Sequence, residues 1–175
     1  MEDVVEPVSD YRERPLVMVL VDLARFTQVI SELNLRETAA VLDGFYRAAE
    51  EVVASAGGRV VKFVGDGCLA AFAPDDALSA LEAIDALRER VRNLGARQGL
   101  VMDVGANVHL ATVAEVRLGS GAVAELVGPG VVHTYRMGGG PGVRMSEPIY
   151  RKLPSERRST WRKRQPPATY TRDEQ

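Results

Sequence analysis

Apolar positions along the chain alternate between short continuous runs and longer stretches with helical spacing. Residues 16–21 (LVMVLV) form a run rich in β-branched side chains, which is typical of a strand buried on both faces. Between residues 35 and 55, apolar side chains recur every three or four positions, and the pattern ends at Gly57 and Gly58. It therefore predicts an amphipathic helix, within a helical region that Thr27 can cap.

The middle of the chain continues this alternation. Residues 59–64 and 68–72 are apolar runs around the turn Gly65-Asp66-Gly67, and an Asp-Gly pair in that position is a strong β-hairpin signal. A second helix is predicted after Pro74, and a further strand over residues 100–110. The predicted order is therefore β-α-β-β-α-β, the ferredoxin-like split motif, in which helices cover one face of an antiparallel sheet.

The remaining pattern predicts an extension of this core. Residues 113–118 and 122–126 are expected to be strands, a short helix is expected after Pro129, and the GGGPG stretch at 138–142 is expected to be a loop. We therefore expect an α+β fold with a C-terminal β/α extension. One domain would span residues 15–153, between an N-terminal tail at 1–14 and a basic, proline-containing segment at 154–175.

Composition narrows the class of protein. The 175 residues are 46% hydrophobic and 26% charged, which is usual for a globular domain, and the net charge of −2 does not favour nucleic-acid binding. Cys68 is the only cysteine, so an internal disulfide is excluded and the residue is expected in the core. The chain shows neither a signal peptide nor the roughly 18 consecutive apolar residues of a membrane helix. We expect a cytoplasmic protein without membrane contact. The basic run 157–164 is interpreted as a solvated tail, with a contact to nucleic acid or anionic lipid as the alternative.

Two carboxylates stand where this topology would bring them together. Asp22 ends the first strand, and Asp66 lies in the hairpin turn between the second and third. The first and third strands are neighbours in a ferredoxin-like sheet, so the two side chains are expected to converge. Because close carboxylates repel each other, a divalent cation would stabilise them, and hard oxygen ligands suit Mg²⁺ or Mn²⁺ bound together with phosphates. A structural role for each aspartate is the alternative.

The surrounding sequence resembles the first half of a class III adenylyl/guanylyl cyclase catalytic domain. In that family a strand ends in Asp, a turn ends in Phe-Thr, and a two-part helix is followed by Gly-Gly and then by a strand with Lys-x-x-Gly-Asp. The agreement covers residues 21–72 and continues more weakly to Leu153. The counterparts in this chain are Asp22, Phe26-Thr27, Gly57-Gly58, Lys62 and Gly65-Asp66.

The resemblance implies both an activity and a site. It implies conversion of ATP into 3′,5′-cyclic AMP and pyrophosphate, by attack of the ribose 3′-hydroxyl on the α-phosphorus with the help of two Mg²⁺ or Mn²⁺ ions. It places the metal ions at Asp22, Leu23 and Asp66, and substrate contacts at Phe26 and Thr27. It also implies a homodimer whose sites lie at the subunit interface, with the aspartates from one subunit and the base-reading residues and an arginine from the other.

The second half of the chain agrees with the family only in part. Arg136 aligns with the arginine that stabilises the transition state. Lys62 and Glu125 align with the base-reading positions and favour ATP over GTP, because a carboxylate can accept from the amino group of adenine but not pair with the guanine carbonyl. Val132 stands where the family has an asparagine that orients the ribose, and valine cannot form that hydrogen bond.

Three functions remain open on this reading. The first is an active adenylyl cyclase. The second is a degenerate cyclase-homology domain, which binds nucleotide or a partner with little or no turnover because of Val132. The third is a diguanylate cyclase of the GGDEF type, which shares the core topology. We rank it last, because residues 64–67 copy that signature poorly and Lys62 has no role in it.

Overall fold

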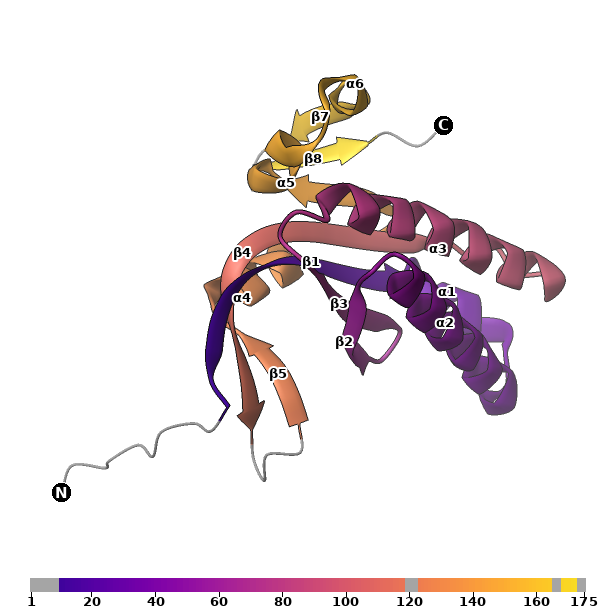
Figure 1. The fold of residues 1–175 in the computed structure, drawn as a ribbon. Helices are drawn as coiled ribbons and strands as arrows, with labels where there is room; N and C mark the ends of the chain where they lie inside the picture. Colours follow the sequence, from indigo (N-terminus) through magenta and orange to yellow (C-terminus); the bar gives the residue numbers. More distant parts are fainter. Residues whose placement is uncertain (1–9, 119–122, 165–167, 173–175) are drawn as a thin grey trace.

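The computed structural model describes residues 10–118, 123–164 and 168–172. In these residues eight strands form one sheet, and helices α2 (Leu35–Ser55) and α3 (Ala77–Arg97) cover one of its faces (Figure 1). The strand order is β2-β3-β1-β4-β6-β8-β7, and β5 pairs with β4. The strands are β1 (Arg12–Leu23), β2 (Arg59–Val64), β3 (Gly67–Phe72), β4 (Val104–Leu118), β5 (Val123–Val127), β6 (Gly142–Ser146), β7 (Trp161–Arg164) and β8 (Thr169–Arg172).

The first four strands form the predicted βαββαβ core. β1 lies between β3 and β4, β2 lies outside β3, and all three pairings are antiparallel. Successive residues of β1 face opposite sides of the sheet. Val17 and Val19 are buried in the cluster beneath α2 and α3, whereas Met18 is buried on the other face, beneath α4 (Pro129–Arg136). The predicted α+β fold class is confirmed.

The helices begin differently from the sequence prediction. α1 (Phe26–Val29) and a 3-10 turn, η1 (Ile30–Glu32), connect β1 to α2, so Thr27 lies inside α1 and does not cap it. Asn34 caps α2 instead. Its side chain accepts a hydrogen bond from the backbone N–H of Glu37, whose carboxylate accepts one from the backbone N–H of Asn34. This capping box satisfies two donors and so determines where α2 begins.

β4 is one strand where the sequence indicates two, at residues 100–110 and 113–118. It is continuous because β1 pairs with it from Val104 to Glu115, across the boundary between the two expected strands. β1 is likewise longer than the apolar run at 16–21, since its polar first part is also paired with β4. Arg14 forms an ion pair with Glu115 there, with 2.5 Å between the charged atoms.

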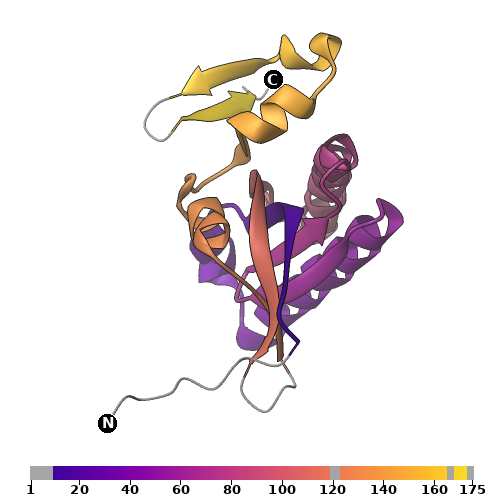
Figure 2. The ribbon, with the colours of Figure 1, turned by 60° about the vertical axis from the view of Figure 1, so that its left-hand side comes forward.

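Part of the segment at 154–175, expected to be peripheral, extends the sheet. β6 runs parallel to β4, and the hairpin of β7 and β8 joins the sheet by pairing β8 with β6 (Figure 2). Two short helices, α5 (Glu147–Lys152) and α6 (Ser155–Arg158), precede the hairpin. The sequence signal is weak because most side chains of β7 are Arg or Lys. Trp161 is nevertheless buried in the main core, with the guanidinium of Arg172 5.3 Å from its ring centroid.

Further expectations fall partly outside the described residues. Of the tail expected at 1–14, residues 1–9 lie outside them, and 12–14 belong to β1. The strand expected at 122–126 begins outside them and is present as β5. Cys68 is completely buried, and burial raises the pKa of its thiol to about 12, which suits a core residue. None of the described helices is long and apolar enough to cross a membrane.

Candidate active site

Asp22 and Asp66 converge at one end of the central strands. Asp22 stands opposite Gly67, the residue that follows Asp66, and the backbone N–H of Leu23 donates to the carbonyl oxygen of Asp66 over 3.0 Å. The pKa of Asp22 is raised above its ordinary value, first by burial and then by the negative charge of Asp66. The backbone N–H of Gly105 and the guanidinium of Arg144 act in the opposite direction. The two carboxylates are therefore close enough to interact electrostatically, as the topology predicts.

Glycines on both neighbouring strands make room for this centre. A Cβ on Gly67 would lie 2.7 Å from the carbonyl oxygen of Val21. A Cβ on Gly105 would lie 2.7 Å from Oδ1 of Asp22, and closer still to the carbonyl oxygen of Gly140. Real side chains essentially never approach so closely, so both positions require glycine. Without these two side chains, the backbones of β3 and of Gly140 can pack closely around Asp22.

The donor set fits a hard divalent cation. The described residues contain no group of three or more His, Cys, Asp or Glu that could hold a metal alone. Mg²⁺ is bound by one or two carboxylates, with waters and substrate phosphates in the remaining positions, and Asp22 and Asp66 meet this requirement. Leu23 has an apolar side chain that is only 3% exposed, so only its backbone carbonyl could be a ligand.

The turn after β1 and the hairpin turn complete this end of the site. Phe26 packs against the main core, while Thr27, the next residue of α1, is exposed. Tyr46 braces the hairpin turn: its hydroxyl donates to the carbonyl oxygen of Gly65 over 2.6 Å, and its ring stacks on Phe63 with 3.8 Å between centroids. Sequence reasoning missed Tyr46, because nothing in the helical pattern distinguishes it from other residues that pack against the core.

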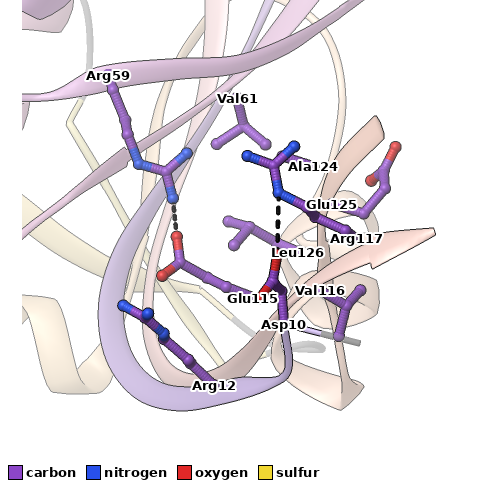
Figure 3. Close-up of a pocket in the computed structure, with 10 residues that line it drawn as sticks. All are labelled: Asp10, Arg12, Arg59, Val61, Glu115, Val116, Arg117, Ala124, Glu125 and Leu126. Atoms are coloured by element: carbon purple, nitrogen blue, oxygen red, sulfur yellow. Dashed lines mark hydrogen bonds and ion pairs between the residues drawn. The ribbon is translucent and has the colours of Figure 1, made fainter. Parts of the chain in front are cut away.

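A second group of predicted residues meets at another place in the fold, between β2 and β5. Nζ of Lys62 on β2 lies 2.7 Å from Oε2 of Glu125 on β5, and the pair is partly buried. Glu125 also borders a pocket between β2 and the β4–β5 hairpin (Figure 3). In this pocket Arg59 forms an ion pair with Glu115. The contact joins β2 to β4, so it helps to keep Glu125 within reach of Lys62.

Arg136 and Val132 share one face of α4. They are four residues apart, both are exposed, and Val132 is 49% exposed. On the opposite face Thr134 is buried, and its hydroxyl donates to the carbonyl oxygen of Gly130 within the helix. The amide of Asn107, on β4, donates to the carbonyl oxygens of Thr134 and Gly138 over 3.0 and 2.9 Å. The helix therefore presents Arg136 and Val132 outward from a fixed position.

The predicted site residues thus fall into two sets. One set contains Asp22, Leu23 and Asp66, with Phe26 and Thr27 in the adjacent α1. The other set contains Lys62 and Glu125, which form an ion pair, and Arg136 on α4, which forms no hydrogen bond or ion pair with either of them in the described part of the chain. Within residues 10–118, 123–164 and 168–172, no hydrogen bond or ion pair joins the two sets.

Two histidines also meet beside α4. The rings of His109 on β4 and His133 on α4 have centroids 4.6 Å apart. Burial, and then the charge of His133, lower the pKa of His109 to about 4. His109 is therefore neutral at physiological pH and serves as a packed residue of the interface between α4 and the sheet.

The need for glycine at position 105 can be tested by substitution. Gly105→Ala should place a methyl group against Asp22 and Gly140, and so lower both the melting temperature and the affinity for Mn²⁺. Gly139→Ala is the matched control, because a Cβ there meets no atom within 4 Å. Thermal denaturation and Mn²⁺ titration measure the two effects. Equal behaviour of the two variants would contradict the crowding of Asp22.

Comparisons with known proteins agree on one fold. No family model matches the chain. A photoactivated adenylate cyclase subunit alpha-like protein from Euglena gracilis is 27% identical over 158 residues, which are 83% of this chain but only 16% of that protein.

Solved structures extend the agreement over nearly all of the chain. A bacterial light-regulated adenylyl cyclase has a TM-score of 0.80 at 16% identity, covering 93% of this chain and 53% of its own. The guanylyl cyclase Cya2 gives 0.74 at 24% identity and 92% of both chains. The catalytic core of a rhodopsin-guanylyl cyclase with converted specificity, in complex with ATPalphaS, has a TM-score of 0.81 at 18% identity. The match covers 95% of this chain and 100% of that one. The described part of the chain therefore has the fold of the class III adenylyl/guanylyl cyclase catalytic domains.

Proposed function

We propose that this chain is a nucleotidyl cyclase that converts ATP into 3′,5′-cyclic AMP and pyrophosphate. The observation that carries the proposal is the pair Asp22 and Asp66, which converge on this fold beside two positions that require glycine. A structural role alone would not explain why a partly buried carboxylate is kept next to a second one, since that arrangement raises its pKa. A pair of this kind is suited to triphosphate chemistry.

Asp22 and Asp66 would hold the divalent cations, with the carbonyl of Leu23 as a further ligand. Bound Mg²⁺ or Mn²⁺ would supply positive charge to the phosphates and make the ribose 3′-hydroxyl easier to deprotonate. The chain itself would orient the reactants. Asp22 on β1 and Asp66 in the hairpin turn would fix the position of the triphosphate of the nucleotide. Phe26 and Thr27 would border the triphosphate. Arg136 would stabilise the negative charge that develops on the phosphates.

Lys62 and Glu125 support ATP as the substrate. An adenine presents a ring nitrogen that accepts a hydrogen bond and an amino group that donates one. The Lys62 ammonium can donate to the nitrogen and the Glu125 carboxylate can accept from the amino group. Guanine presents a carbonyl oxygen in place of the amino group, and Glu125 has no proton to donate to it. The 2.7 Å contact between the two side chains supports their acting on one base.

A homodimer would bring the two sets of residues together. The aspartates of one subunit would face Lys62, Glu125 and Arg136 of the other, in a head-to-tail arrangement with two equivalent sites. Exposed apolar side chains near these elements support an interface. They are Val64, Val127, Val132 and Tyr135.

Val132 supports a second candidate, a cyclase-homology domain with little turnover. It is exposed on the same face of α4 as Arg136 and cannot hydrogen-bond a ribose. Loss of one positioning donor costs about 10²–10³ in rate in comparable sites. In this case the chain would bind nucleotide but release little product.

Activity can be measured directly on the full chain. Each of the four nucleoside triphosphates is incubated with Mg²⁺ or Mn²⁺, and cyclic products are identified by mass spectrometry. We expect cyclic AMP from ATP, and none from Asp66→Asn, which loses a metal ligand. Asp75→Asn is the matched control, because Asp75 is an exposed aspartate paired with Lys152. If no triphosphate reacts while calorimetry still detects ATP binding, the chain is the binding domain instead.

Mixing two inactive variants tests the dimer. Asp66→Asn and Arg136→Ala should each be inactive alone, because each spoils both sites of its own homodimer. Heterodimers of the two would contain one site with both residues intact, so the mixture should recover about a quarter of the wild-type rate. No recovery, despite exchange of subunits shown by differently tagged chains, would contradict a shared site.

The position of Val132 can be tested separately. Val132→Asn should raise turnover by about 10²-fold, because asparagine can orient the ribose. Val101→Asn is the control for a general effect of asparagine, since Val101 is 96% exposed and distant in sequence from α4. The rate of cyclic AMP formation is compared at saturating ATP. An unchanged rate would show that Val132 does not occupy the ribose position.

A further inference from the structure

Arg144 lies on the same face of the sheet as Asp22. In the register of β1, β4 and β6, Asp22 is opposite Gly105, which is opposite Gly142, and Arg144 stands two residues further along β6. Residues two apart in a strand point to the same side. The residues that alternate with Gly142 and Arg144 support this assignment, because Val143 and Met145 are buried on the opposite face, with α2 and α3.

No side chain separates Arg144 from Asp22 along this row. The two positions between them, Gly105 and Gly142, carry none. The carbonyl oxygen of Gly140 and Oδ1 of Asp22 both lie next to the place that a Cβ on Gly105 would occupy. Gly140 is in turn a hydrogen-bond acceptor of Arg144. The carbonyl oxygen that accepts from the guanidinium therefore lies close to the carboxylate of Asp22.

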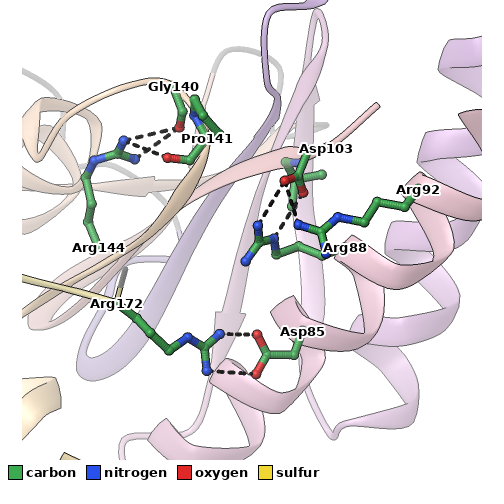
Figure 4. Close-up of polar contacts among 9 residues, drawn as sticks. Asp85, Arg88, Arg92, Asp103, Gly140, Pro141, Arg144 and Arg172 are labelled. Atoms are coloured by element: carbon green, nitrogen blue, oxygen red, sulfur yellow. Dashed lines mark hydrogen bonds and ion pairs between the residues drawn. The ribbon is translucent and has the colours of Figure 1, made fainter. Parts of the chain in front are cut away.

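The guanidinium is held by backbone carbonyls. Its Nη1 donates to Gly140 over 3.3 Å, and its Nη2 donates to Gly140 and to Pro141 over 3.2 Å each (Figure 4). Nη2 also donates to the carbonyl oxygen of Gly139. Three consecutive carbonyls of the loop at 138–142 thus fix its position. A long arginine side chain is otherwise mobile, so this arrangement places a charge at a defined point.

Arg144 differs from the other arginines in the same view. Arg88 and Arg92 bind the carboxylate of Asp103, and Arg172 binds that of Asp85 (Figure 4). Among the residues that the structure describes, no carboxylate forms an ion pair with Arg144. Its charge is solvated by neutral carbonyls and remains available to act on Asp22.

We propose that the positive charge of Arg144 belongs to the metal centre. In the absence of nucleotide, this charge weakens the binding of a divalent cation at Asp22 and Asp66. The proposal rests on the proposed function, because it assumes that the two aspartates bind the metal. With two carboxylates and one guanidinium, the centre has one net negative charge instead of two. A nucleoside triphosphate adds several negative charges, so the metal would bind together with the nucleotide.

Mn²⁺ titration of the full chain without nucleotide tests this effect. Arg144→Met removes the charge and keeps an unbranched side chain, and it should bind Mn²⁺ about tenfold more tightly, as expected for one unit charge near a divalent ion in a partly solvated site. Arg144→Lys keeps the charge but loses the fork that holds the loop, and it should bind Mn²⁺ as the wild type does. Bound and free Mn²⁺ are distinguished by electron paramagnetic resonance. Thermal melting establishes that each variant is folded, and Arg144→Gln replaces Arg144→Met if the latter is not.

The outcomes separate this inference from the proposed function. If Asp22→Asn binds Mn²⁺ as tightly as the wild type, the metal centre itself is wrongly placed. If Asp22→Asn loses Mn²⁺ binding but Arg144→Met binds no more tightly than the wild type, the metal centre stands and the role of Arg144 is overturned. Weaker binding by both Arg144→Met and Arg144→Lys would also overturn it, because Arg144 would then act only by holding the loop.

Discussion

The pairing of β1 with both of its neighbours is the interaction on which the rest of the structure depends. β1 is hydrogen-bonded to β3 on one side and β4 on the other, and Asp22 stands opposite a glycine on each. A shift of one residue in either register would exchange the two faces of the strand. The carboxylate of Asp22 would then enter the core beneath α2 and α3, where burying a charge costs several kcal/mol. The register that builds the core therefore also builds the site.

The parts of the fold that could be predicted have a local signal. Asp66 could be placed in a hairpin because Asp-Gly stands between two apolar runs, and α2 because its apolar spacing is regular. Lys62 and Glu125 are 63 residues apart, and no local pattern relates them. They could be paired only through the resemblance to a family, whose order of motifs carries information about contacts that one chain's periodicity does not.

The parts that could not be predicted depend on backbone carbonyl and N–H groups, which every sequence offers, or on very short strands. β6 has five residues with Arg144 at its centre, which is neither an alternating nor a continuous apolar pattern. The contacts of Arg144 are to backbone carbonyls, and these leave no trace in the types of side chain around it. The sequence predicts two strands where β4 is one, because its continuity depends on the pairing with β1. In each case the deciding partner is distant in sequence.

The buried amide of Asn107 has a mechanical consequence. It donates at once to Thr134, in α4, and to Gly138, at the start of the loop that Arg144 holds. Neither segment can be displaced without leaving a buried N–H group unsatisfied, at a cost of about 1–3 kcal/mol. The outward face of α4 and the loop beside Asp22 are therefore coupled through Asn107, so a displacement of one segment would disturb the position of the other.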